Sequence, residues 1–458
     1  MSRAVSSSES CAVSREIGAY IAAAHRRPLP PEVAEKTKLH LLDSLAAILS
    51  GSRLKPGLFA ARFAQALGGP EEAQVLGTGI RVSAINAALA NGMAAHADET
   101  DDSHLRSRAH LGCAVVPAAL ALAERNGRSG RELMNAVALG YDIGARSTMA
   151  LGYGPAKTQK HSTHSIAATF GASAAAGTLI HPSTEQAVFI LSFAAQQASG
   201  VPSWNRDSEH VEKAFDFGGM GARNGVFGAL IVEAGASGVS DPMIGRHSFL
   251  DGFAEKPDEA ELTRGLGAEF EVMQASIKKW CVGSPIQAAL DSLVYLMEQH
   301  TIGADDVEAI TAIMPDDRLH VVSDAAISDI CLQYLLAVTL IDGTLTFVSS
   351  HDEARMHDPA VLAMRARIRA VPSPELTVAR PARQAIIELH LKNGTTVSRR
   401  THAVLGTPDN PMSPQEVVAK AEDLVAPVIG QGRARELSAR IMDIESCTDV
   451  RELRPLFA

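Results

Sequence analysis

The sequence predicts a mainly α fold in which a large, discontinuous all-helical domain carries a smaller inserted α+β domain. Three observations predict it. Apolar residues recur three and four positions apart through most of residues 13–268, as on buried helix faces. Short β-branched and alternating segments then replace this period. A helix-start signature, Ser413-Pro414-Gln415-Glu416, returns the chain to helix. We expect one domain at 1–267 plus 404–458 and the other at 268–403.

Length and composition favour this architecture. The chain has 458 residues, which is too many for one compact core. Hydrophobic residues make up 46% of it and aromatic residues only 4%, whereas alanine and glycine are plentiful. A core with so few large rings has to be built from closely packed helices with small side chains between them.

The predicted helices of the first stretch follow one another closely. Pro30-Pro31 precedes the first strong apolar run, and prolines are tolerated at the start of a helix. Ser129 and Glu132 have the spacing of a capping box. Helices are expected at 32–50, 82–96, 114–125, 129–151, 166–180, 184–199 and 222–234.

The middle block mixes strands and helices. Residues 307–314 are β-branched and short, which predicts a strand. Residues 383–390 alternate apolar and polar side chains, and Lys392-Asn393-Gly394 separates them from a second run at 395–400. Because Asn-Gly is typical of a tight turn, these two runs predict a hairpin. Helices are expected at 284–300 and 332–341.

Charge and cysteine content exclude several classes of protein. The formal net charge is −10, and no block of lysine and arginine is dense enough to follow a phosphate backbone, so we expect no nucleic-acid partner. The five cysteines include no Cys-x-x-Cys pair, which favours a reducing compartment. Residues 1–11 lack the apolar core of a signal peptide, and no uninterrupted apolar run is long enough to span a membrane. We expect a cytoplasmic protein without membrane contact.

Residues 96–110 form the most informative segment. They hold four carboxylates, three histidines and two arginines between two alanine-rich stretches. A solvated, charged loop is the plainest interpretation. A divalent-metal site is another, but the spacing matches no known metal motif. The third is acid–base chemistry, with carboxylates and histidines tuned toward neutral pH by burial. We expect the third, and no metal. The ligands that the metal interpretation would use are His96, Asp98, Glu99, Asp101, Asp102 and His104.

Two later segments could complete a polar site. Residues 157–165 place His161 and His164 at the entrance of a predicted helix, where backbone N–H groups favour an anion. Helix capping by the serines and threonine of that segment explains it equally well. Residues 209–223 combine Lys213 with three glycines, which could let backbone approach a ligand or simply form a turn.

The middle block supplies the remaining candidates. Residues 277–285 carry Lys278 and Lys279, which could clamp carboxylates or could be surface cations. Tyr334 lies inside the apolar run 331–340 and is, on pattern alone, more typical of a core residue than of a catalyst.

Together these segments resemble one family, MmgE/PrpD, which contains 2-methylcitrate dehydratase, cis-aconitate decarboxylase and iminodisuccinate epimerase. The resemblance runs from about residue 13 to the end of the chain. Seven motifs carry it in the family's order: Asn91-Gly92 with Ala95 to Ser103 and His110; Val115 to Leu120; His161 with Thr169 to Ala172; Lys213 with Ala222 to Gly225; Lys278 or Lys279; Tyr334 with Asp342-Gly343; and Asn410-Pro411-Met412-Ser413.

The resemblance implies a helical domain closed by the last segment of the chain, an inserted lid domain, and a site in a cleft between them. It implies a homodimer that binds a small carboxylate and uses neither metal nor organic cofactor. The sequence departs from the family pattern at Glu99, usually aspartate, at Leu111, usually proline, and at Asp216 and Gln287, usually histidine. These departures predict a less cationic site, whose substrate has fewer carboxylates or bears an amine.

The function implied is a cofactor-independent lyase or dehydratase that removes a proton next to a carboxylate of a small di- or tricarboxylic acid. An epimerase, isomerase or decarboxylase using the same deprotonation is the alternative, and a non-catalytic carboxylate-binding protein is a third hypothesis. We expect His110 and His161 as acid and base, with Glu99 and Ser103 orienting them or Glu99 itself as the base. Lys213 and Lys278 or Lys279 would bind carboxylates, and Tyr334 would donate a proton.

Overall fold

The computed structural model describes residues 7–152 and 160–458, so Lys157 of the second polar segment lies outside the described residues. The chain packs as two compact units. Unit 1 comprises the residues up to Ala97, Asp101–Ala275 and Pro414–Ala458, and unit 2 comprises Asp98–Thr100 with Ser276–Ser413. The mainly helical class is confirmed, with 60% helix and 10% strand. No described helix combines the length and the apolar character needed to cross a membrane.

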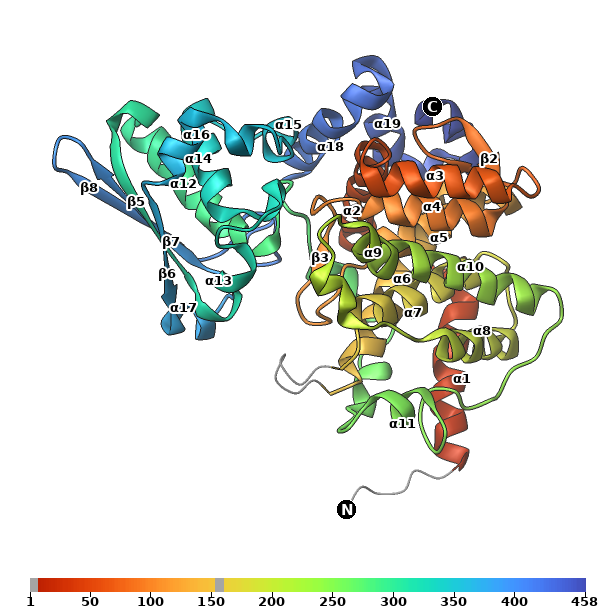
Figure 1. Cartoon of the computed structure of the whole chain (residues 1–458). Coiled ribbons are helices and arrows are strands. Elements are labelled where there is room, and N and C mark those ends of the chain that lie inside the picture. Colours follow the sequence, from red (N-terminus) through yellow and green to blue (C-terminus); the bar gives the residue numbers. More distant parts are fainter. Residues whose placement is uncertain (1–6, 153–159) are drawn as a thin grey trace. The chain divides into compact units, whose positions relative to one another are not determined.

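Unit 1 is a stack of helices (Figure 1). The helix predictions are confirmed to within a few residues, and the capping box of Ser129 and Glu132 is present at the start of α6. The helix α3 and the short strands β1 and β2 lie between the predicted helices at 32–50 and 82–96, where we predicted no element. The helices are α1 (Ser7–Ala24), α2 (Pro31–Gly51), α3 (Lys55–Leu67), α4 (Ala84–Ala95), α5 (Gly112–Asn126), α6 (Gly130–Met149), α7 (Thr163–Thr178), α8 (Thr184–Gln197), α9 (Val211–Ala214), α10 (Met220–Glu233) and α11 (Phe249–Phe253). The strands are β1 (Ala73–Val75), β2 (Ile80–Val82), β3 (Ser103–His104) and β4 (Ala275–Ser276).

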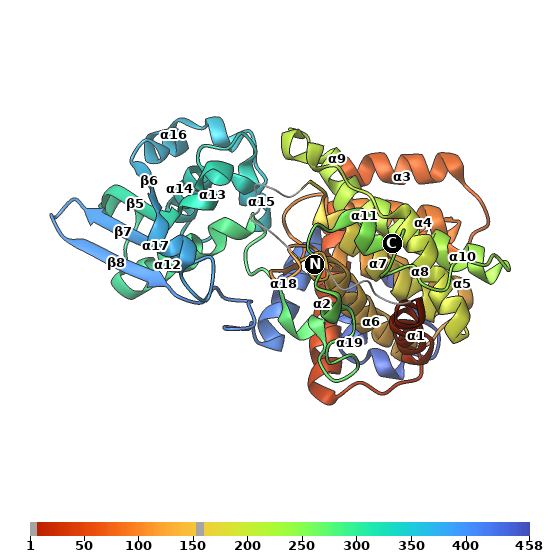
Figure 2. The same ribbon diagram turned by 90° about the horizontal axis from the view of Figure 1, so that it is seen from below.

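Small residues let the central helices of unit 1 touch through their backbones. Helix α7 packs against α5, α6 and α10, and α1 lies along α8 (Figure 2). A Cβ atom added to Gly171 would lie 2.7 Å from the carbonyl oxygen of Gly140, and one added to Gly144 would lie 2.7 Å from that of Ala167. The expected core of closely packed helices with small side chains is therefore confirmed.

The last segment of the chain returns to unit 1. Helices α18 (Pro414–Ile429) and α19 (Gln431–Met442) follow the signature at residues 413–416, and α18 packs along α2. The ammonium of Lys420 lies 2.6 Å from Oδ1 of Asp43, and both side chains are almost fully buried. A buried ion pair of this kind fixes how α18 sits on α2.

Unit 2 is built around a four-stranded sheet of order β6-β5-β7-β8. The predicted strand at 307–314 and the predicted hairpin are confirmed: β7 and β8 pair antiparallel, with His390 opposite Thr396. The sequence did not indicate β6, which pairs parallel to β5 at the edge of the sheet and contains Pro372. An edge strand tolerates proline and needs no alternating pattern. The strands are β5 (Val307–Pro315), β6 (Ile368–Ser373), β7 (Ala385–Leu391) and β8 (Thr396–Thr401).

Helices cover the sheet of unit 2 and complete its core. Helix α12 packs on β7 and β8, and α14 packs on β6 and on α12 (Figure 1). Leucine, isoleucine and valine side chains fill the space between them, together with the fully buried Tyr334. The helices are α12 (Gln287–His300), α13 (Asp316–Val322), α14 (Leu332–Asp342), α15 (Phe347–Ser350), α16 (Pro359–Arg365) and α17 (Pro374–Val378).

Candidate active site

Asp101 joins two histidines of unit 1. Its Oδ1 atom lies 3.0 Å from Nδ1 of His96 and 3.1 Å from Nδ1 of His110. Burial by itself would raise the pKa of Asp101, but the neighbouring His110 and His96 outweigh it and hold that pKa well below its usual value. An ionised carboxylate can only accept hydrogen bonds, so both Nδ1 atoms carry a hydrogen. In each neutral ring the lone pair is then on Nε2, as a general base requires.

The two histidines differ in access. His96 is fully buried, burial lowers its pKa, and its Nε2 has no hydrogen-bond partner among the described residues. The side chain of His110 keeps 11% of its surface exposed. A base has to reach its substrate, so His110 is the better candidate and His96 is the histidine that stays neutral beside it.

An aromatic side chain organises the rest of this cluster. Phe217 stacks on His96 at 4.3 Å between ring centroids and on His164 at 3.6 Å. The Nζ atom of Lys213 lies 5.3 Å from the centroid of the same ring, and Lys213 also lowers the pKa of His96. Phe217 belongs to a π-helical turn, Phe215–Gly219, between α9 and α10, and such turns are common at functional sites. Unit 1 therefore brings together His110 and Lys213 with His96 and His164, for which the sequence predicted no catalytic role.

The π-helical turn depends on close backbone contact with α4. A Cβ atom on Gly218 would lie 2.0 Å from the carbonyl oxygen of Gly92, and neither backbone can move aside cheaply. We expect Gly218→Ala to lower the free energy of unfolding by about 3 kcal/mol, the upper part of the usual range for overpacking. The control is Gly432→Ala on the exposed surface of α19, where the added Cβ meets nothing within 4 Å. Urea denaturation measures both variants, and equal midpoints would contradict the assigned packing role.

Asp102 supports the same loop from the other side. Its Oδ2 atom lies 3.0 Å from Nδ1 of His40 and accepts the hydroxyl hydrogen of Tyr141 at 2.5 Å. Its Oδ1 accepts the backbone N–H of Gly112, at the start of α5, at 3.0 Å. These contacts fix the backbone just after His110, so Asp102 positions the base.

Asp216 lies at the entrance of α7. Ser162 precedes this helix, and its hydroxyl donates to Oδ2 of Asp216 at 2.5 Å and accepts the indole N–H of Trp204 at 3.2 Å. Burial raises the pKa of Asp216 to about 7, although Ser162 lowers it. The sequence left anion binding and helix capping equally open at this helix entrance, and in the structure a carboxyl group of the chain itself lies beside it.

The carboxylate of Glu99 belongs to unit 2. Lys278 Nζ donates to the backbone carbonyl of Glu99 at 2.6 Å and lies 3.5 Å from its Oε2, and both side chains are buried. The backbone N–H of Glu99 donates to Oδ2 of Asp329 at 3.3 Å. Nζ of Lys279 instead lies 4.8 Å from the centroid of the Trp280 ring. Of the two lysines that the sequence left open, Lys278 is the one beside Glu99.

An ion pair between Asp98 and His351 ties the segment Asp98–Thr100 to the rest of unit 2. Nε2 of His351 lies 2.9 Å from Oδ2 of Asp98 and 3.9 Å from Oδ2 of Asp329. Asp98 also accepts the backbone N–H of Thr100 at 2.8 Å. Burial would lower the pKa of His351, but the two aspartates raise it to about 9, so the imidazolium form prevails at neutral pH.

This ion pair predicts a pH dependence of stability. Because the folded-state pKa of His351 is raised, its contribution is complete below the ordinary histidine pKa of about 6.5 and is lost as the pH rises through about 9. We expect a loss of about 3 kcal/mol in unfolding free energy over that range. Urea denaturation between pH 6 and pH 10 measures it, and His351→Gln should flatten the curve. The control is His300→Gln, at an exposed position on α12. If the stability of His351→Gln depended on pH as steeply as that of the wild type, the assignment would be contradicted.

Three predicted residues lie apart from these contacts. His161 packs against Phe253 at 4.9 Å between centroids, so His164, and not His161, joins the Phe217 cluster. Tyr334 is fully buried and donates its hydroxyl hydrogen to the carbonyl of Ser349 at 2.6 Å, which supports a structural role. Ser103 is half-buried in β3. Catalytic roles for these three residues stay predictions.

The side chains of residues 96–110 that could bind a metal ion contact other residues of the protein instead. A group of metal-ligand type within unit 1 consists of His96, Asp101 and Cys113. Asp101 already accepts from two histidines, and burial raises the pKa of Cys113 well above its usual value. A protonated thiol and an occupied carboxylate make a poor set of metal ligands.

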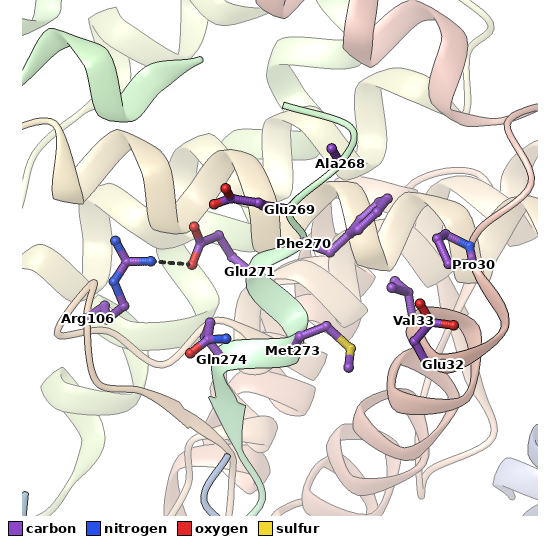
Figure 3. A pocket seen from close by; sticks show the side chains of 10 residues that line it. All are labelled: Pro30, Glu32, Val33, Arg106, Ala268, Glu269, Phe270, Glu271, Met273 and Gln274. Atoms are coloured by element: carbon purple, nitrogen blue, oxygen red, sulfur yellow. Dashed lines mark hydrogen bonds and ion pairs between the residues drawn. The ribbon is translucent and has the colours of Figure 1, made fainter. Parts of the chain in front are cut away.

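A cavity of about 360 Å³ lies elsewhere in unit 1, at the start of α2 (Figure 3). None of the predicted site residues lines it. One of its charged lining residues is Glu271, which lies 3.5 Å from Nη1 of Arg106 and 3.3 Å from Nε2 of His104. The lining residues are Pro30, Glu32, Val33, Arg106, Ala268, Glu269, Phe270, Glu271, Met273 and Gln274.

Comparisons with known proteins identify the family. The MmgE/PrpD N-terminal domain model matches residues 15–261, and the MmgE/PrpD C-terminal domain model matches residues 280–445. The chain belongs to the MmgE/PrpD family, as the seven motifs indicated.

Several relatives are similar over almost their whole length. Cis-aconitate decarboxylase of Aspergillus terreus is 24% identical, over 93% of this chain and 92% of that protein. A cis-aconitate decarboxylase-like protein of Aspergillus oryzae is 25% identical, over 94% of each chain. Cis-aconitate decarboxylase of Homo sapiens is 23% identical, over 93% of this chain and 91% of that protein.

Proposed function

We propose that the protein is a cofactor-independent lyase that removes a proton next to a carboxylate of a small di- or tricarboxylic acid. The observation that carries this proposal is the bridge from Asp101 to Nδ1 of both His96 and His110. This contact fixes the orientation of the His110 ring and leaves the lone pair of its Nε2 atom able to act as a base. The relatives from Aspergillus terreus and Homo sapiens are both named as decarboxylases of a small carboxylic acid, cis-aconitate.

The other residues have roles that follow from their charges. Deprotonation next to a carboxylate builds negative charge on that carboxylate, so cations close to it stabilise the transition state. In unit 1 the cation is Lys213, held over the ring of Phe217. In unit 2 it is Lys278, whose ammonium also fixes Glu99. His164 is a second acid or base candidate, in place of His161, because it stacks on the same ring as His96.

The fate of the carbanion decides the reaction. A dehydratase expels a hydroxide from it, and an epimerase returns a proton to the other face. A decarboxylase forms its carbanion differently, because the bonding pair stays on carbon when carbon dioxide leaves, and the protonated base then donates a proton to that carbon. The names of the relatives favour a decarboxylase over an epimerase as the alternative. The buried Asp216, with a pKa raised to about 7, favours a substrate with few carboxylates, because a partly ionised carboxyl group repels another anion.

The experiment is a panel of small hydroxy- and unsaturated di- and tricarboxylates, incubated with the purified protein in deuterium oxide and followed by NMR. A dehydratase gives an alkene that absorbs at about 240 nm, an epimerase gives recovered substrate that carries deuterium, and a decarboxylase releases carbon dioxide. Binding without turnover across the panel would favour the non-catalytic hypothesis. Dialysis against a chelator should leave the rate unchanged if no metal takes part.

The family resemblance also leads us to propose a homodimer in the cytoplasm. Light scattering should then give twice the 48.3 kDa of one chain. A concentration-independent mass of one chain would contradict the homodimer.

A further inference from the structure

His104 closes the loop that holds the candidate base. Its backbone N–H donates to the carbonyl of Ala109 at 2.8 Å, and the backbone N–H of Ala109 donates to the carbonyl of His104 at 3.3 Å. Along the chain, Asp101 comes shortly before this closure and His110 directly after it. The way in which His104 is held therefore determines how His110 meets Asp101, at 3.1 Å.

Local contacts fix the tautomer of the His104 ring. The backbone N–H of Ser107 donates to Nδ1 of His104 at 3.1 Å, so Nδ1 carries a lone pair. The hydrogen of this neutral ring is then on Nε2, which lies 3.3 Å from Oε2 of Glu271. The side chain of His104 is 0% exposed and that of Glu271 is 3% exposed. An imidazole N–H and a carboxylate attract each other more strongly in such a shielded place than in water.

Glu271 is itself fixed to two helices of unit 1. Its backbone N–H donates to Oδ1 of Asp142 on α6 at 2.6 Å, and Oδ2 of Asp142 accepts the hydroxyl hydrogen of Tyr20 on α1 at 2.6 Å. Arg106 adds a second contact from the loop, with 3.5 Å between its Nη1 and Oε2 of Glu271. Burial would raise the pKa of Glu271, but His104 and then Arg106 hold it below its usual value. Glu271 is thus an ionised and fixed anchor for the loop.

We propose that Glu271 positions the candidate base His110 by holding His104. The carboxylate fixes the ring of His104, the backbone of His104 pairs with Ala109, and Ala109 is followed by His110. Because Glu271 acts through His104, it is a positioning residue. The inference rests on the proposed function, since it concerns the base of that reaction, and it adds a residue that neither the motifs nor the resemblance indicated.

Two substitutions of His104 separate its two side-chain contacts. Glutamine places an amide N–H where Nε2 lies and keeps a donor for Glu271, whereas asparagine places an amide oxygen where Nδ1 lies and keeps an acceptor for Ser107. We expect His104→Asn to lower kcat by at least about 10-fold, with KM within about 2-fold of wild type. We expect His104→Gln to keep kcat within about 3-fold of wild type. The rates are measured with the acid of the panel that the wild type converts.

Nitrogen NMR of the full-length protein labelled at its histidines gives a second readout, which needs no substrate. We expect the ring resonances of His110 to move in His104→Asn and to keep their wild-type positions in His104→Gln. Glu271→Met removes the acceptor from the other side of the contact and should move them as His104→Asn does, so the comparison does not depend on the folding of one variant. The matched control is Glu269→Met, at an exposed position nearby, which should leave them in place.

The possible outcomes are distinct. If His104→Asn and Glu271→Met leave the His110 resonances in place and only lower the urea midpoint, the contact is structural and the inference is wrong. Equal disturbance by His104→Gln and His104→Asn would assign the effect to Ser107 or to packing, and would also overturn it. If the wild type converts no acid of the panel, the proposed function fails, whereas the resonances still decide whether Glu271 orients His110. Displaced resonances and a lower kcat, both restored in His104→Gln, support the inference and the proposed function together.

Discussion

Asp101→Asn is expected to lower kcat/KM by at least about 10³-fold while the protein remains folded, because an amide cannot accept from two imidazole N–H groups as a carboxylate does. In the wild type one ionised carboxylate fixes the Nδ1–H tautomer of His96 and of His110. The amide offers an N–H of its own, which turns one ring to the opposite tautomer. The base then presents a hydrogen where it needs a lone pair.

The control for this prediction is Asp409→Asn, which makes the same chemical change at an exposed position. Circular dichroism and the urea midpoint establish folding for both variants. A rate within about 10-fold of wild type for Asp101→Asn would show that orientation of His110 does not limit catalysis.

Lys278→Met is expected to lower the free energy of unfolding of unit 2 by about 3–5 kcal/mol, because it removes a buried ammonium that donates to the carbonyl of Glu99 and lies 3.5 Å from its Oε2. Lys278 is 2% and Glu99 7% exposed by side chain, so water cannot take over the lost interaction. The double variant Lys278→Met with Glu99→Gln removes both charges and should recover most of the loss. This non-additivity distinguishes an ion pair from simple packing.

Lys279→Met is the matched control, since Lys279 is half-buried, with its ammonium 4.8 Å from the centroid of the Trp280 ring. Its effect should stay below about 1 kcal/mol. Equal losses for the two lysines in urea denaturation would contradict the assignment of Lys278 to Glu99.

The sequence was sufficient for the fold because the signals that build it are local. Apolar spacing indicated the helices, Ser129 with Glu132 indicated one helix start, and Lys392-Asn393-Gly394 indicated the hairpin. Strand β6 could not be predicted, because its pairing with β5 is parallel and brings together residues distant in the chain. Parallel pairing leaves no turn signature between the two strands.

The candidate site could be predicted only in part. Residues 96–110 showed that histidines and carboxylates come together, but spacing within an irregular loop does not tell which carboxylate faces which histidine. The sequence analysis therefore singled out Glu99 to orient the histidines, whereas in the structure Asp101 contacts both of them. The stacking of Phe217 on His96 and His164 could not be predicted, because it depends on a π-helical turn for which no sequence pattern is known. The choice of His164 over His161 depends on which of them stacks on that ring.

The same reasoning applies to unit 2. His351 is isolated in the sequence, and only folding brings it to Asp98, which is more than two hundred and fifty residues away in the chain. A histidine without a neighbouring motif carries no sequence signal for such a role.

Nitrogen NMR of protein labelled at its histidines measures the protonation of each ring nitrogen and tests the proposed base most directly. Comparison with His110→Gln and His96→Gln assigns the two resonances. For the neutral ring of His110, the contact with Asp101 predicts a hydrogen on Nδ1 and a bare Nε2, and Asp101→Asn should disturb the rings of both histidines. A hydrogen on Nε2 and a bare Nδ1 for His110 would contradict the account.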